Sequence, residues 1–75
     1  MSINFRQLEV FRAVAETNGF TRASHVLFIS QSTVSQHIKG LEDELGCPLF
    51  LRVGKRVLVT EAGTVLLPLG RSRRD

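Results

Sequence analysis

Hydrophobic residues in the middle of the chain recur at the spacing of an α-helix. Between Ser30 and Leu45, in the sequence SQSTVSQHIKGLEDEL, they stand three or four residues apart, which places them on one face of a helix. They are Val34, Ile38, Leu41 and Leu45. The Ser30 hydroxyl is suited to cap the first turn, and Gly46 followed by Pro48 is a typical end signal. The pattern predicts one helix over residues 30–45.

The polar face of this helix differs from a surface kept only for solubility. Its first half carries hydroxyl and amide side chains, whereas its acids, Glu42, Asp43 and Glu44, come at the far end. Ser, Thr and Gln are good hydrogen-bonding partners for base edges and phosphates, and acids at a helix C-terminus oppose the helix dipole. The pattern favours a helix whose first half approaches a negatively charged partner. The alternative is an ordinary solvated helix face.

A first helix is predicted before this one. Asn4 and Gln7 form a capping-box pair, and Asn18–Gly19 is a strong end signal because both residues tolerate positive φ. The predicted apolar face comprises Phe5, Leu8, Val10, Phe11, Val14 and Ala15.

A shorter helix follows, capped by Thr21 and spanning about Arg22–Phe28. Its predicted inward residues are Ala23, Val26 and Leu27. The tight connection to Ser30 fits a helix-turn-helix over about residues 20–39. Two short helices of any α-helical bundle would give the same pattern.

The hydrophobic period changes after Pro48. Leu51, Val53, Val57 and Val59 favour strands, and Gly54–Lys55 marks a turn between them, so we predict a two-stranded wing at about residues 50–59. Its basic residues are suited to meet phosphates or to enter a minor groove. They are Arg52, Lys55 and Arg56. The alternative is that they are ordinary turn charges.

A last helix is predicted to start at Thr60 as its N-cap. Its apolar stripe comprises Ala62, Val65, Leu66 and Leu69, and Pro68 is expected to interrupt it because the ring removes a donor and clashes one turn back. The leucines of this segment either form a dimer surface or pack on Phe5 and Phe11. Residues 70–75 form a basic tail.

Composition limits the function classes. The chain has 75 residues, one cysteine and a net charge of +3, which fits one small domain in a reducing cytoplasm. No apolar run approaches the roughly 20 residues of a membrane span. His25 and His37 lack partners at metal-ligand spacing, and Cys47 is expected to fill a turn. With no nucleophile–base pair or phosphate loop, we expect no enzyme, cofactor or metal.

The sequence resembles the N-terminal DNA-binding domain of LysR-type transcriptional regulators from about Asn4 to Leu67. The signature is SQSxVSxxIxxLExxLGxxLFxR followed by VxxTEAG, which is far more specific than a lone helix-turn-helix pattern. The resemblance implies a mainly α, winged helix-turn-helix fold with a three-helix core, a two-stranded β wing and the start of a linker helix. Residues 3–60 would form the DNA-binding domain, and residues 60–69 a truncated linker and dimerisation helix.

When the family's functional positions are transferred to this sequence, the resemblance implies roles for three sets of residues. Base-reading contacts are implied for Gln31, Ser32, Ser35 and Gln36. Contacts to the DNA backbone or minor groove are implied for Thr21, Arg22, Thr33, Lys39, Arg52, Lys55 and Arg56. Dimerisation is implied for Ala62, Val65, Leu66 and Leu69. Ser32 departs from a proline often found there. The family's long linker helix and sensor domain are replaced by PLGRSRRD, so we expect weakened dimerisation and no small-molecule site.

Two functions of different classes follow from these observations. The first is sequence-specific binding of double-stranded DNA, with the 30–45 helix in the major groove and the wing in the minor groove, by a homodimer that regulates a bacterial promoter. The second is a protein-interaction module without a sensor domain that heterodimerises with a full-length relative.

Overall fold

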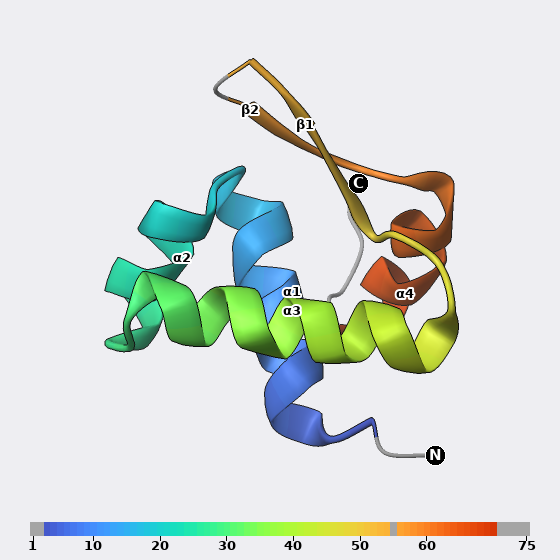
Figure 1. Cartoon of the computed structure of the whole chain (residues 1–75), viewed down its shortest axis with the longest axis horizontal. Coiled ribbons are helices and arrows are strands. Elements are labelled where there is room, and N and C mark those ends of the chain that lie inside the picture. Colours follow the sequence, from blue (N-terminus) through green and yellow to red (C-terminus); the bar gives the residue numbers. More distant parts are fainter. Residues whose placement is uncertain (1–2, 55, 71–75) are drawn as a thin grey trace.

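The computed structural model describes the backbone of residues 3–54 and 56–70, and the side chains of all but the last three of these. Figure 1 shows packed helices with a hairpin rising above them, and the last helix, in orange to red, at the base of the hairpin. The elements are α1 (Phe5–Thr17), α2 (Phe20–Leu27), α3 (Gln31–Leu45), β1 (Phe50–Val53), β2 (Arg56–Val59) and α4 (Glu61–Gly70). This arrangement confirms the predicted winged helix-turn-helix fold.

The core lies between α1, α3 and the start of the wing. Its largest fully buried side chains are Phe11, Leu41, Leu49, Val10, Val14 and Val34. The predicted apolar faces of α1 and α3 therefore point inward, with one exception. Phe5, in the first turn of α1, is 80% exposed.

The predicted caps of α1 and α3 are confirmed. The Asn4 side chain accepts from the Gln7 N–H at 2.8 Å, and the Gln7 side chain accepts from the Asn4 N–H at 3.1 Å. The Ser30 hydroxyl accepts from the Thr33 N–H at 3.1 Å. Asn18 and Gly46 end their helices in the left-handed conformation, at φ 60° and 76°. These local bonds fix where the two long helices start and stop.

The prediction for α2 was partly wrong. The helix begins two residues earlier than expected, with Gly19 rather than Thr21 as its N-cap, and Phe28 lies beyond its end at φ 59°. The stripe that packs inward consists of Phe20, Ala23, Ser24 and Leu27. Val26 lies off this stripe and is 59% exposed. An eight-residue helix is too short for periodicity to choose between neighbouring stripes.

The wing matches its prediction. β1 and β2 pair antiparallel from Phe50 opposite Val59 to Val53 opposite Arg56. Gly54 takes φ +62° at the turn, a conformation that glycine adopts without steric cost. Lys55, the other predicted turn residue, lies outside the described residues.

The last helix starts as predicted, but Pro68 does not interrupt it as expected. The Thr60 hydroxyl accepts from the Gly63 N–H at 3.1 Å, and the α4 backbone stays helical to Gly70. A proline ring removes one hydrogen bond and crowds the carbonyl four residues back, but two turns of α4 precede it. Leu66 and Leu67 also pack against the core, which holds that turn in place.

Most of the predicted basic tail, residues 71–75, lies outside the described residues. Within the described part of the chain, none of the helices is both long and apolar enough to cross a membrane.

Candidate nucleic-acid interface

The first turn of α3 is organised around the Ser30 hydroxyl. Besides capping the helix, its oxygen lies 2.8 Å from the Thr33 hydroxyl and 3.2 Å from the Ser32 hydroxyl, both within hydrogen-bonding distance. Ser32 is exposed and Thr33 is half-buried. The hydroxyl groups at this helix end are therefore held in a fixed cluster at the surface.

The amide side chains of α3 lie on the same outer face. Gln31 and Gln36 are exposed, and Ser35 is half-buried. The Gln31 side-chain oxygen accepts a hydrogen bond from the Thr21 hydroxyl at 3.0 Å. Lys39, further along the helix, forms a 3.6 Å salt bridge with Asp43. The predicted base-reading residues thus form one polar surface over the first half of α3.

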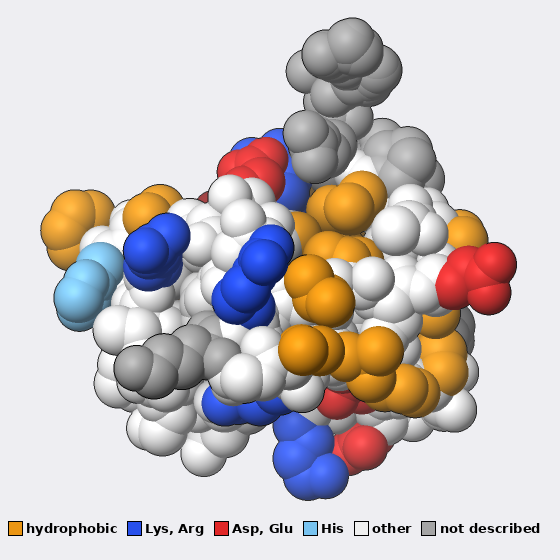
Figure 2. All heavy atoms as spheres, turned by 90° about the horizontal axis from the view of Figure 1, so that it is seen from above, with side chains coloured by type: hydrophobic (Ala, Val, Ile, Leu, Met, Phe, Trp, Pro, Cys, Tyr) orange, Lys and Arg blue, Asp and Glu red, His pale blue; other side chains and the backbone are white. Residues whose placement is uncertain are grey.

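A groove of about 420 Å³ separates this surface from the wing. It lies between the start of α2, the start of α3 and the hairpin. Among the described residues, the charged side chains that line it are Arg22, Arg52 and Arg56, without an acid. Figure 2, which looks onto the wing side, shows the Lys and Arg side chains toward the left half of this face, while hydrophobic side chains gather on the right half and at the far left edge beside a His. The groove is suited to an anionic partner.

The three arginines of this groove are not neutralised within the described part of the chain. The salt bridges found there join Arg6 to Glu9, Arg12 to Glu16 and Lys39 to Asp43, so none involves Arg22, Arg52 or Arg56. The acids of α3 follow its polar half at the other end of the helix. Positive potential is therefore concentrated where the start of α3 and the wing face the same side.

Arg52 is held in place by an aromatic side chain of α2. Its guanidinium carbon lies 4.6 Å from the centre of the Phe20 ring, a distance typical of a cation–π contact. Phe20 in turn packs edge-on against Phe50 at 6.0 Å between centroids, and Phe50 packs against Phe11 at 5.2 Å. This row of rings connects the core to the basic side of the wing. No local sequence pattern indicates this role of Phe20, because its partner Arg52 lies 32 residues later in the chain.

Glu42 is a second residue whose role the sequence analysis missed. Its carboxylate accepts from the Leu49 N–H at 2.7 Å and from the Phe50 N–H at 3.4 Å. The acid that opposes the α3 dipole therefore binds the backbone at the start of β1. Glu42 lies in α3 and Leu49 lies beyond its end, so the helical period does not apply between them and no local signal could have identified this contact.

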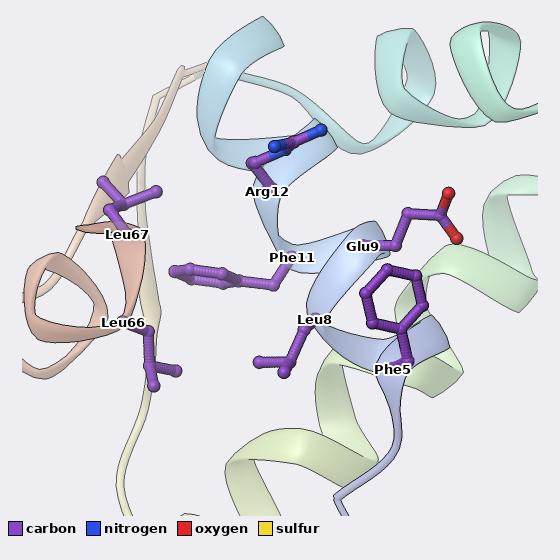
Figure 3. Close-up of a pocket in the computed structure, with 7 residues that line it drawn as sticks. All are labelled: Phe5, Leu8, Glu9, Phe11, Arg12, Leu66 and Leu67. Atoms are coloured by element: carbon purple, nitrogen blue, oxygen red, sulfur yellow. The ribbon is translucent and has the colours of Figure 1, made fainter. Parts of the chain in front are cut away.

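The predicted dimerisation residues lie along α4 and beside an apolar pocket. Figure 3 shows Leu66 and Leu67 of α4 facing Leu8 and Phe11 of α1 across a pocket of about 250 Å³. Phe5 lines the outer side of the same pocket. The two alternatives for these leucines, packing on α1 and forming a dimer surface, thus both have a structural basis. α4 packs on α1, and an apolar surface stays open between them.

The other predicted dimerisation residues differ in exposure. Ala62 is half-buried against the core, whereas Val65 is 70% exposed. The Leu69 side chain lies outside the described residues. Within the described residues, no group of His, Cys, Asp or Glu side chains could hold a metal ion.

Comparison with known proteins agrees with this geometry. The family model for the bacterial regulatory helix-turn-helix protein, lysR family, matches residues 5–64. The RuBisCO operon transcriptional regulator of Allochromatium vinosum is 47% identical over 72 residues, which cover 96% of this chain and 24% of that protein. The uncharacterized HTH-type transcriptional regulator YeiE of Escherichia coli is 50% identical over 68 residues, or 91% and 23% of the two chains. The chain spans about a quarter of the length of these curated relatives.

Solved structures share the fold. The CbnR_DBD–DNA complex superimposes with a TM-score of 0.83 at 35% identity, covering 87% of this chain and 75% of that one. The BenM_DBD/catB site 1 DNA complex gives a TM-score of 0.84 at 36% identity, covering 88% and 73%. With the family model matching most of its length, the chain belongs to the LysR family of bacterial regulatory helix-turn-helix proteins.

Proposed function

We propose that this domain binds double-stranded DNA at specific sequences and thereby regulates transcription from a bacterial promoter, in the cytoplasm. One observation carries the proposal: the first turn of α3 and the side chains of Arg22, Arg52 and Arg56 border one groove, and none of the described residues that line it is acidic. Two related domains with the same fold are described as DNA complexes, which supports the same partner here.

In this proposal α3 is the recognition helix and enters the major groove with its first half. The exposed amides of Gln31 and Gln36 read base edges, and the hydroxyls of Ser32 and Ser35 add or mediate contacts. An amide can both donate to and accept from one base, and each good bidentate contact contributes about 1–3 kcal/mol of discrimination against the wrong base. The 15-residue length of α3 and its fixed N-cap support a rigid reading surface.

The flanking residues act mainly on the phosphate backbone. Thr21, Arg22, Thr33 and Lys39 contact phosphates beside the major groove. Arg52 and Arg56 of the wing, together with Lys55, reach the adjacent minor groove. Contacts of this kind add affinity without base preference, and they make binding depend steeply on salt because counterions are released from the DNA.

We infer further that the domain forms a homodimer through α4 and binds a partly palindromic site. Ala62, Val65, Leu66 and Leu69 would line the contact. The exposure of Val65 and the open apolar pocket beside Leu66 support this inference. A two-fold dimer presents two recognition helices, so half-sites about one helical turn apart, or a multiple of it, are expected.

The test is selection of bound sequences from a random double-stranded pool, carried out at two salt concentrations. We expect enrichment of a half-site, and paired half-sites at fixed spacing if α4 dimerises the domain. Gln36→Ala should lose the base preference at one position of the site. Arg52→Ala should lower the affinity for all sites and reduce the slope of log affinity against log salt concentration by about 1.

Weak, salt-dependent binding without any enriched sequence would contradict sequence-specific recognition by this domain. Formation of mixed dimers with a full-length relative under the same conditions would then favour the interaction-module alternative. Equal loss of affinity on all sequences in Gln36→Ala would contradict its base-reading role alone.

A further inference from the structure

The start of α4 is tied to the segment that leads into the wing. The Thr60 hydroxyl donates to the Pro48 carbonyl at 2.7 Å, and the Thr60 N–H donates to the Leu49 carbonyl at 2.9 Å. The same hydroxyl accepts from the Gly63 N–H at 3.1 Å. Since carbonyls only accept and N–H groups only donate, the direction of each bond is fixed. One side chain therefore both caps α4 and binds it to the chain ahead of β1.

The backbone of Leu49 connects α4 to the recognition helix. Its carbonyl accepts from Thr60, as above, and its N–H donates to the Glu42 carboxylate of α3 at 2.7 Å. Leu49 is itself fully buried. α4 also lies directly against this residue, because a Cβ added at Gly63 would lie 2.8 Å from the Leu49 carbonyl oxygen. The end of α3, Leu49 and the start of α4 therefore form one hydrogen-bonded unit.

The second half of α4 is held less closely than its start. Leu66 and Leu67 face α1 across the pocket of about 250 Å³ (Figure 3), and both leucines are only half-buried. Val65 is 70% exposed. The pocket leaves room for the helix to tilt toward α1 or away from it. The hydrogen bonds at the start of α4 therefore decide its direction.

The direction of α4 matters in the proposed homodimer, because α4 joins the two recognition helices. With ten residues, α4 is about 15 Å long. A tilt of about 10° at Thr60 would move its far end by about 2.5 Å, and the second copy would double that shift. One base-pair step of DNA is about 3.4 Å, so such a tilt is enough to move the recognition helices by one base pair relative to the half-sites.

We propose that Thr60 is a positioning residue that sets the separation between the two half-sites of the DNA site. Thr60 acts through α4, whose direction it fixes relative to α3, and it need not contact the DNA or the second copy. The proposal rests on the proposed DNA binding and on the proposed homodimer through α4.

The test compares four variants with the wild type. Thr60→Ser keeps both hydrogen bonds of the hydroxyl, and Thr60→Val removes both. Thr60→Asp still accepts from the Gly63 N–H but cannot donate to the Pro48 carbonyl, so it keeps the helix cap and loses the bond to the chain ahead of β1. Thr64→Val is the matched control, because the Thr64 hydroxyl donates at 2.7 Å to the Glu61 carbonyl within α4.

Selection from a random double-stranded pool with the wild type first gives the half-site and its preferred spacing. Affinities are then measured on duplexes with that spacing and with one base pair more or fewer. In Thr60→Val and Thr60→Asp, the preference for the wild-type spacing should fall about three- to tenfold, with the base preferences inside each half-site unchanged. Thr60→Ser and Thr64→Val should keep the wild-type spacing preference.

A second measurement needs no DNA. Residual dipolar couplings of the backbone N–H groups report how α3 and α4 are oriented relative to one another in the free protein. One alignment tensor should fit both helices in the wild type, in Thr60→Ser and in Thr64→Val. In Thr60→Val and Thr60→Asp, the couplings of α4 should be reduced relative to those of α3.

Unchanged spacing preferences in Thr60→Val and Thr60→Asp, or an equal loss in Thr64→Val, would overturn the proposal. So would a wild type that binds paired half-sites equally well at several spacings. Enrichment of single half-sites only would refute the homodimer and this proposal with it, while DNA recognition would stand. If the wild type enriched no sequence, the proposed function and this proposal would both fail, and the couplings would still show whether Thr60 holds α4.

Discussion

Removing the Glu42 side chain should detach the start of the wing from the recognition helix. Its carboxylate accepts from the Leu49 N–H at 2.7 Å and, more weakly, from the Phe50 N–H at 3.4 Å. Both of these residues are buried, so in Glu42→Ala the two donors lose a charged acceptor where water reaches them poorly. The variant should therefore unfold more easily.

The size of the effect follows from the type of bond. A hydrogen bond to a charged group contributes about 1.5–3 kcal/mol to the free energy of unfolding. Glu42 is half-buried rather than enclosed and its second bond is long, so the lower part of that range, about 1.5–2 kcal/mol, is expected. In a domain of this size that loss lowers Tm by about 6–16 °C.

Asp43→Ala is the matched control, because it removes the same charge from the same end of α3. The Asp43 side chain is 67% exposed and its only described salt bridge is the one with Lys39 at 3.6 Å, and an exposed pair of this kind contributes about 0.3–0.5 kcal/mol. Both variants remove an acid that opposes the helix dipole, so that contribution cancels in the comparison. Glu42→Gln keeps an uncharged acceptor and should fall between Glu42→Ala and the wild type.

The assay is urea denaturation followed by far-UV circular dichroism, with thermal unfolding as a second measurement. We expect a lower denaturation midpoint for Glu42→Ala with an unchanged slope, since the surface exposed on unfolding stays the same. A free energy of unfolding for Glu42→Ala within about 0.5 kcal/mol of that for Asp43→Ala would refute the reasoning. It would mean that water replaces the carboxylate at the start of β1 at little cost.

Three other substitutions test further features of the fold. Gly63→Ala should lower the free energy of unfolding by more than about 1 kcal/mol, although alanine has the better helix propensity, because the added Cβ would lie 2.8 Å from the Leu49 carbonyl oxygen. An unchanged midpoint in urea denaturation would contradict that close approach. Phe28→Asn should raise stability by about 1 kcal/mol, since Phe28 is 93% exposed at φ 59°; a lower Tm would show that its ring makes a stabilising contact. Phe20→Leu should weaken DNA binding, with a coupling of about 0.5–1 kcal/mol to Arg52→Ala in a double-mutant cycle; additive losses would exclude the cation–π contact as the cause.

The features that sequence predicts well are those with local signals. Asn4 and Gln7 cap α1 from three residues apart, and the Ser30 cap and the Gly46 stop are equally close to the helix they bound. Such bonds form within one turn, so residue identity and spacing suffice to recognise them. The same holds for the wing, where Gly54 and the flanking β-branched residues specify a hairpin.

The features that the sequence does not predict depend on contacts between helices and strands that are far apart in the chain. α2 starts at Phe20, directly after the extended backbone of Gly19, whereas Thr21 had looked like the better cap. Val26 was expected inside on hydrophobicity alone, but the stripe through Phe20 and Leu27 reaches the core and leaves Val26 outside. Pro68 was expected to interrupt a helix whose backbone in fact stays helical to Gly70. Each miss is a case in which tertiary contact decides between local alternatives of similar energy.

The contacts that sequence missed share one consequence for recognition. Glu42 ties the start of β1 to α3, and Phe20 ties Arg52 of the same strand to α2, so the wing is fixed at its base and along its side. A recognition helix and a wing that moved independently would each lose freedom on binding DNA, and that loss would reduce affinity. Because the recognition helix and the wing are already held together in the free protein, little freedom should be lost on binding DNA. The spacing between the helix and Arg52 then becomes a property of the protein, and DNA whose major and minor grooves match that spacing should bind best.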